Sequence, residues 1–129
     1  AGIAETAELE VLRDDLTLSA VELMRELLQR PTPPTAIIAG NNRMTIGAPR
    51  AMRELGRLDD LALVGFDDFD TADILGVSVV SYDPVELGRR AAELALERMR
   101  EPTGFTQQIV LPTWVIARGT GERPPRAPE

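Results

Sequence analysis

Two kinds of hydrophobic pattern alternate along this chain, and together they predict an α/β fold. Apolar residues recur at helical spacing over residues 17–30 and 42–56, and a third helical stretch covers residues 85–100 and ends before Pro102. Between these segments lie short apolar runs, which are typical of strands in a buried sheet. The runs that predict strands are residues 9–12, 35–39, 61–65, 77–81, 107–111 and 114–118.

Strands that alternate with helices of this length favour a parallel, twisted sheet with helices on both faces. The last two strands are expected to be antiparallel additions. Asn42 is expected to cap the second helix, and Asp83 with Pro84 is expected to begin the third. Residues 121–129 have no apolar periodicity, so they predict a flexible tail after a folded unit of residues 1–120.

The composition excludes several classes of function. The 129-residue chain contains no histidine and no cysteine, which removes the commonest general base and the thiolate metal ligands. We therefore expect no metal, no cofactor and no enzymatic activity. The net charge of −7 opposes contact with DNA phosphates. No run approaches the roughly 20 apolar residues that span a bilayer, and no export signal is visible, so a cytoplasmic location is expected.

Polar residues stand directly after several predicted strands. In open α/β sheets, ligands bind outside the carboxyl ends of the strands, so a site is expected at these positions. Carboxylates and amides can make paired hydrogen bonds to the hydroxyls of a sugar-like or nucleoside-like ligand. Asn41 and Asp67 are the best candidates, because they precede the positions that cap helices or form turns. The polar positions are Asp14, Asp15, Asn41, Asn42, Asp67, Asp68, Tyr82 and Asp83.

Three other interpretations of these residues are open. Asp and Asn often follow strands simply because they cap helices and form turns. Asp67 and Asp68 could act as an acid and base pair, but adjacent side chains usually point apart, and no His, Lys or Cys is present to assist them. With Asp70, the two aspartates loosely follow the spacing of a calcium loop, yet the required glycine and terminal glutamate are missing.

Several motifs occur in a family-like order. They are PTAIIAGNNRMTIGA at 34–48, RAMRELG at 50–56, LVGFDD at 63–68, ELGRRAAEL at 86–94, and LP with VIAR within 111–118. Over residues 14–120 the chain resembles the LacI/GalR family of bacterial transcriptional regulators. Members of that family have a helix-turn-helix domain, a hinge and a two-lobed core like that of the periplasmic sugar-binding proteins. The resemblance implies the C-terminal lobe of such a core, with a periplasmic binding protein-like type I fold.

The resemblance also implies which residues contact the effector, the small molecule held between the lobes. Asn41 and Asp67 occupy positions whose side chains reach sugars or purines in relatives. Leu16 stands where many relatives carry an aromatic ring, and Tyr82 stands where many carry a glutamine. The expected contact residues are therefore Leu16, Asn41, Asp67 and Tyr82, and the ligand can differ from the usual effectors.

The resemblance implies a homodimer, and the chain departs from the family near that interface. Pro49 falls inside a helix that helps to form the interface in relatives, where a kink is expected at a cost of about 3 kcal/mol. The loop over residues 69–76 is about two residues shorter than the resemblance predicts. Asn42 also replaces the usual aspartate of the family's Asn-Asp pair.

The sequence therefore predicts the ligand-sensing portion of a transcriptional regulator, with a small polar effector as its partner. Contact with DNA is expected only through a separate helix-turn-helix domain, and no membrane partner is expected. The alternative is one lobe of a periplasmic sugar-binding protein of an ABC transporter, which shares the architecture. A helix-turn-helix and hinge upstream would favour the regulator, whereas an export signal would favour transport.

Overall fold

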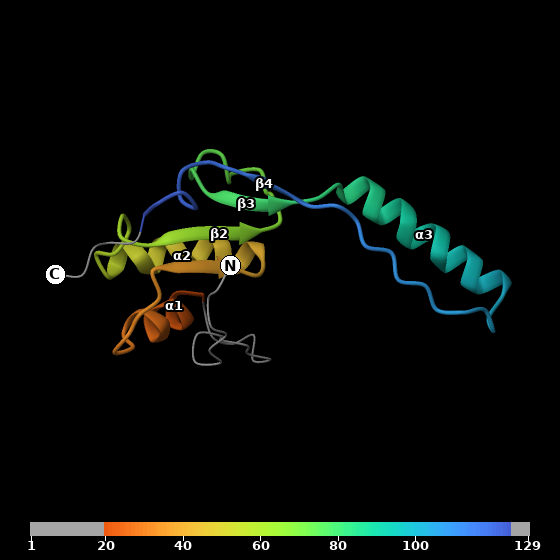
Figure 1. Ribbon diagram of the computed structural model, residues 1–129, viewed down its shortest axis with the longest axis horizontal. Helices are drawn as coiled ribbons and strands as arrows, with labels where there is room; N and C mark the ends of the chain where they lie inside the picture. The colour runs from red at the N-terminus through yellow and green to blue at the C-terminus, as the bar shows by residue number, and fades with distance from the viewer. Residues whose placement is uncertain (1–19, 125–129) are drawn as a thin grey trace.

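Within residues 20–124, which the computed structural model describes, the chain forms four strands and three helices (Figure 1). The predicted strand at residues 9–12 lies outside this range. The strands are β1 (Ala36–Ala39), β2 (Ala62–Phe66), β3 (Ser78–Ser81) and β4 (Trp114–Ile116). The helices are α1 (Ala20–Leu28), α2 (Asn42–Glu54) and α3 (Pro84–Arg100). Their order along the chain is the order that the hydrophobic pattern predicts.

The strands form one sheet in the order β1-β2-β3-β4. The first three are parallel, as predicted, and β4 pairs antiparallel with β3. Only one strand of the predicted final pair is present in the described residues, because residues 107–111 form no strand. That segment runs beside α3, away from the sheet, where it has no neighbouring strand to supply hydrogen bonds (Figure 1).

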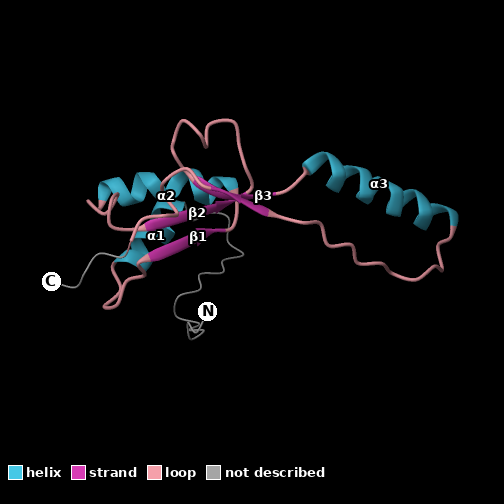
Figure 2. Ribbon diagram, turned by 45° about the horizontal axis from the view of Figure 1, so that its top comes forward, coloured by secondary structure: helices cyan, strands magenta, loops and turns pink. Residues whose placement is uncertain are grey.

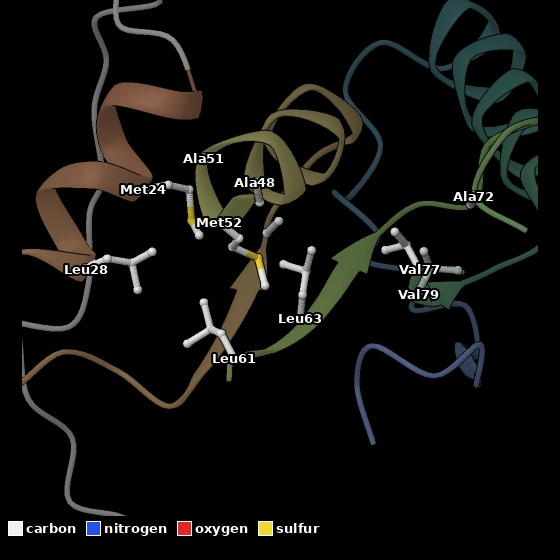
Figure 3. Close-up of a cluster of buried hydrophobic side chains, with 11 residues drawn as sticks. Met24, Leu28, Ala48, Ala51, Met52, Leu61, Leu63, Ala72, Val77 and Val79 are labelled. Atoms are coloured by element: carbon white, nitrogen blue, oxygen red, sulfur yellow. The ribbon is translucent and has the colours of Figure 1, made fainter. Parts of the chain in front are cut away.

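The core lies between the sheet and two of the helices. α2 packs on β1 and β2, and α1 packs against α2 (Figure 2). α2 continues as one helix through Pro49. The buried side chains come from both helices and from the strands, as Figure 3 shows. They include Met24, Leu28, Ala48, Ala51, Met52, Leu61, Leu63, Val77 and Val79. Burial of these apolar surfaces is the main favourable term in the stability of this layer.

α3 does not join this core. None of its residues is buried, and both ribbon views show it extending away from the sheet (Figures 1 and 2). The segment after it, residues 101–113, returns alongside the helix, and we call α3 with this segment the arm. In the described part of the chain, the helical cover predicted for the second face of the sheet is therefore not supplied by α3.

A glycine allows α2 to lie close to β2. A Cβ atom at Gly65 would stand 2.5 Å from Cγ2 of Thr45 and 2.6 Å from its Oγ1. Thr45 is fully buried, and its hydroxyl donates a hydrogen bond of 2.9 Å to the Asn41 carbonyl. The threonine cannot rotate away without losing that bond. Residue 65 must therefore lack a side chain for this packing to form.

Hydrogen bonds centred on Ser78 hold the end of the described chain against the sheet. The buried Ser78 hydroxyl donates to Glu122 at 2.9 Å and accepts from the backbone N of Gly121 at 3.1 Å. The backbone N of Ser78 donates to Oγ1 of Thr120 at 2.9 Å. Residues 121 and 122, with which the predicted flexible tail would begin, are thus fixed to β3 because their polar groups find partners there. Residues 125–129 lie outside the described part.

Gly65→Ala should lower the free energy of unfolding by about 1–3 kcal/mol, the usual cost of forcing extra atoms into a packed core. Gly40→Ala is the matched control, because a Cβ atom at Gly40 would meet nothing within 4 Å. Urea unfolding of the two variants and of the unchanged chain measures the difference. Equal destabilisation by both substitutions would contradict the close packing at Gly65.

Candidate functional site

The carboxyl ends of the three parallel strands meet at one edge of the sheet. β1 pairs with β2, and β2 pairs with β3, so the residues that follow these strands are neighbours in space. Asn41, Asp67 and Tyr82 are among them. Three of the four expected contact residues therefore share this edge. Leu16 and the two aspartates that precede it lie outside the described residues.

Asn41 is the residue that caps α2, so the predicted cap at Asn42 is wrong by one position. The backbone of Asn41 is extended, and its Oδ1 accepts a hydrogen bond of 3.0 Å from the backbone N of Met44. Asn42 is the first residue of the helix. Both positions carry asparagine, which caps helices well, so only the backbone conformation decides between them. The cap uses the amide oxygen of Asn41 and does not require its two N–H donors.

Asp67 ends β2 in a left-handed backbone conformation. Its φ is 73°, which among the described residues is the only positive φ outside glycine. Aspartate tolerates this region better than most residues. The backbone N of Asp67 donates a hydrogen bond of 3.0 Å to the Val80 carbonyl, so the turn is attached to β3. The conformation turns the chain out of the sheet at the edge where Tyr82 stands.

Tyr82 lies next to Asp67. The negative charge of Asp67 raises the pKa of the Tyr82 phenol above its ordinary value of 10.0, because a phenolate would stand beside a carboxylate. The Tyr82 ring also lies near the ring of Phe66, with centroids 6.4 Å apart and planes inclined by 33°. Phe66, which is not among the predicted contact residues, adds apolar surface beside Tyr82.

Asp68 has a different partner from Asp67. Its two oxygens accept hydrogen bonds of 2.8 and 2.9 Å from the guanidinium group of Arg118. This hydrogen bonding holds the pKa of Asp68 below its ordinary value of 3.8. The two aspartates therefore point apart, as predicted, and do not form an acid and base pair. In residues 20–124, no group of three or more acidic side chains could hold a metal ion.

The remaining polar residues of this edge have structural roles. Asp83 caps α3 as predicted, since its Oδ1 accepts hydrogen bonds from the backbone N atoms of Val85 at 2.9 Å and Glu86 at 3.0 Å. Arg118 is a residue that sequence reasoning missed. Its position at the end of the last predicted strand was the available signal, but nothing in the sequence pairs it with Asp68.

The fold and a match to a family model place this chain in a known class of domains. Residues 2–120 match the family of periplasmic binding protein-like domains. This match covers nearly the whole chain and agrees with a mostly parallel α/β sheet whose polar residues gather at the carboxyl ends of the strands. The chain is therefore a periplasmic binding protein-like domain.

Individual relatives show which family within this class of domains the chain resembles. The ribose operon repressor of Escherichia coli strain K12 is 30% identical over 103 residues, which are 77% of this chain and 31% of the repressor. A LacI transcriptional regulator from a Rhodococcus species has a solved structure that is 29% identical, with a TM-score of 0.68 over 81% of this chain and 40% of that one. The chain belongs to the LacI family of transcriptional regulators, as its motifs indicate.

A third relative shows likeness in fold alone. It is a LacI family regulator from Enterococcus faecium, solved with bound ribose, which is 24% identical with a TM-score of 0.62 over 81% of this chain and 39% of that one. The chain spans about a third of the length of the ribose operon repressor. These relatives are a repressor and regulators and not enzymes, which agrees with the predicted absence of catalysis.

Among the helices of the described range, none is long and apolar enough to cross a bilayer.

Tyrosinate formation can test the contact between Asp67 and Tyr82. Tyr82 is the single tyrosine of the chain, so an ultraviolet titration reports on it alone. The midpoint should lie above 10.0, and Asp67→Asn should lower it toward that value by removing the nearby negative charge. Asp70→Asn, at an exposed aspartate three positions later, is the control and should change the midpoint little. An equal midpoint in Asp67→Asn and the unchanged chain would refute the contact.

Proposed function

We propose that this chain is the ligand-sensing part of a cytoplasmic transcriptional regulator and that it binds a small polar effector at the carboxyl edge of its sheet. The observation that carries the proposal is the shared sheet edge at which Asn41, Asp67 and Tyr82 follow three neighbouring parallel strands. Effector binding would change the affinity of the whole protein for DNA, which a separate helix-turn-helix domain contacts. Such control is a coupling between two distant sites.

The side chains at this edge suit ligands that carry hydroxyl groups. The Asp67 carboxylate accepts hydrogen bonds, the Tyr82 hydroxyl both donates and accepts, and the amide of Asn41 can donate. Phe66 is 36% exposed and supplies an aromatic surface on which a sugar ring or a base can pack. A sugar-like or nucleoside-like molecule combines these two requirements, because it has adjacent hydroxyls and a weakly polar face.

The arm supports the presence of a facing lobe. Several of its apolar side chains are more than half exposed, and exposed apolar patches of this kind mark interaction surfaces. The arm begins directly after Tyr82 and Asp83, at the carboxyl edge of the sheet (Figure 1). A second lobe packed on the arm would therefore face that edge, and residues 1–120 would supply one lobe of the two-lobed core. The exposed residues are Val85, Leu96, Met99, Phe105 and Val110.

A periplasmic sugar-binding protein of a transporter is the second candidate, because residues 2–120 match a domain family shared with such proteins. The repressor and regulators among the relatives favour the first candidate. The gene decides between them, since a helix-turn-helix and hinge before this chain would indicate a regulator, whereas an export signal would indicate transport.

A thermal denaturation screen of the full-length protein should find the effector, because a bound ligand raises apparent stability. D-ribose is the first probe, since a structural relative was solved with it, and other sugars and nucleosides follow. Asp67→Asn should weaken binding of the stabilising ligand by at least about 10-fold, because a hydrogen bond to a charged group contributes about 1.5–3 kcal/mol. Asp70→Asn is the matched control. Unchanged calorimetric affinity in Asp67→Asn would contradict the assignment.

The loop over residues 69–76 supports a homodimer, which the family resemblance implies. Phe69 packs against the core and Ala72 is fully buried, so the loop is anchored to the domain. Ile74 and Leu75 are 80% and 48% exposed and present adjacent apolar side chains to solvent. We infer that this pair packs against a second copy of the protein, because such surfaces favour association.

Replacement of both residues by aspartate, Ile74→Asp with Leu75→Asp, should convert a dimer to a monomer by placing charges in an apolar interface. The control exchanges the same residues conservatively, Ile74→Leu with Leu75→Ile, and should remain dimeric. Size-exclusion chromatography with light scattering on the full-length protein measures both masses. A dimer that survives the aspartate variant would place the interface elsewhere.

A further inference from the structure

We propose that the ion pair between Asp68 and Arg118 is a positioning device for the effector site, which holds the turn at Asp67 so that the Asp67 carboxylate meets Tyr82. The inference rests on the proposed function, because it assigns Asp67 to the effector. Arg118 would touch neither the ligand nor Asp67 and would act through Asp68.

The geometry of the pair supplies the first argument. Nη1 and Nη2 of Arg118 donate to Oδ1 and Oδ2 of Asp68 at 2.8 and 2.9 Å, so the contact is bidentate. Two parallel hydrogen bonds fix the plane of the carboxylate as well as its distance. The Arg118 side chain is only 17% exposed, and that of Asp68 is 33% exposed. The guanidinium end of the pair is therefore partly shielded from solvent, whereas the carboxylate end remains more exposed.

Arg118 is itself held in place by the sheet. Its Nη1 also donates to the Val77 carbonyl at 3.3 Å, and its backbone N donates to the hydroxyl of the buried Ser78 at 3.0 Å. These contacts attach the guanidinium group to the start of β3. The Asp68 carboxylate that it binds lies 50 residues away in sequence, two positions after the end of β2. The ion pair thus ties the end of β2 to a fixed point on the neighbouring strand.

The backbone at Asp67 explains why such a tie is needed. A left-handed φ of 73° is less favourable than an extended backbone even for aspartate, so contacts on both sides of the turn help to hold it. On one side, the backbone N of Asp67 is bound to the Val80 carbonyl. On the other side, the next residue is Asp68, held by Arg118. Release of Asp68 would free the turn to relax, and Asp67 would move away from Tyr82.

The titration of Tyr82 tests this idea without any effector. Arg118→Met keeps an unbranched apolar stem but removes the guanidinium group and with it the bidentate contact. Loss of a nearby positive charge and exposure of the Asp68 charge would by themselves raise the pKa of Tyr82 further. Displacement of Asp67 would instead lower the midpoint toward 10.0, as is expected for Asp67→Asn. The sign of the shift therefore separates repositioning from a direct effect of charge.

We expect a downward shift of the Tyr82 midpoint in Arg118→Met, with circular dichroism showing a folded chain at the titration pH. Arg118→Lys restores the charge without the fork and should also shift downward. Arg57→Met is the matched control, because Arg57 forms a partly buried ion pair with Asp60 and its loss changes the net charge equally. That variant should leave the midpoint near that of the unchanged chain.

An unchanged or higher midpoint in folded Arg118→Met would overturn the proposal, and so would full recovery in Arg118→Lys, since charge alone would then suffice. The negative charge of Asp73 also helps to raise the pKa of Arg118. Replacement of Asp68 would therefore leave Arg118 with a second acidic neighbour, so Arg118 is the better residue to replace. Failure of the proposed function is detected by a separate measurement, the affinity for sugars or nucleosides. Asp67→Asn would then leave that affinity unchanged, whatever the Tyr82 titration shows.

Discussion

The parallel hydrogen bonding of β2 to β1 on one side and to β3 on the other is the constraint on which the rest of the structure depends. It places the carboxyl ends of three strands at one edge, where ligands of open α/β sheets bind. It also places Gly65 under α2, so that the helix can approach the sheet closely enough to bury Thr45. The close packing of the core and the position of the candidate site therefore both depend on β2.

The candidate site lies on a hydrogen-bonded sheet, and it includes a left-handed backbone turn at Asp67 that neighbouring contacts hold in place. β2 ends in a left-handed turn at Asp67, whose backbone is bound to β3 and whose successor is gripped by Arg118. Arg118 follows β4, and the segment after it is bound to Ser78 of β3. The end of the described chain therefore contributes to the order of a site that it does not touch. The arm differs, because several of its apolar residues are exposed to solvent.

Sequence reasoning succeeded where a local signal was sufficient. Asp83 followed by Pro84 has one good interpretation, and Asp83 does cap α3. It failed where two residues carried the same signal, as in Asn41 and Asn42, because the choice depends on which of them has an extended backbone. It also failed at residues 107–111, since an apolar run forms a strand only where a neighbouring strand supplies hydrogen bonds. The family motifs identified the fold, but they do not reveal the contacts of the polar residues.

The sequence by itself determined the family, the gathering of polar residues after the parallel strands, and the type and order of the described helices and strands apart from residues 107–111. These features follow from periodicity and from residue types that act over a few positions. Only the tertiary structure decided that Asp67 lies beside Tyr82 while the adjacent Asp68 binds Arg118. Those partners follow different strands and lie up to 50 residues apart, so their meeting depends on strand order and register and on the left-handed turn at Asp67.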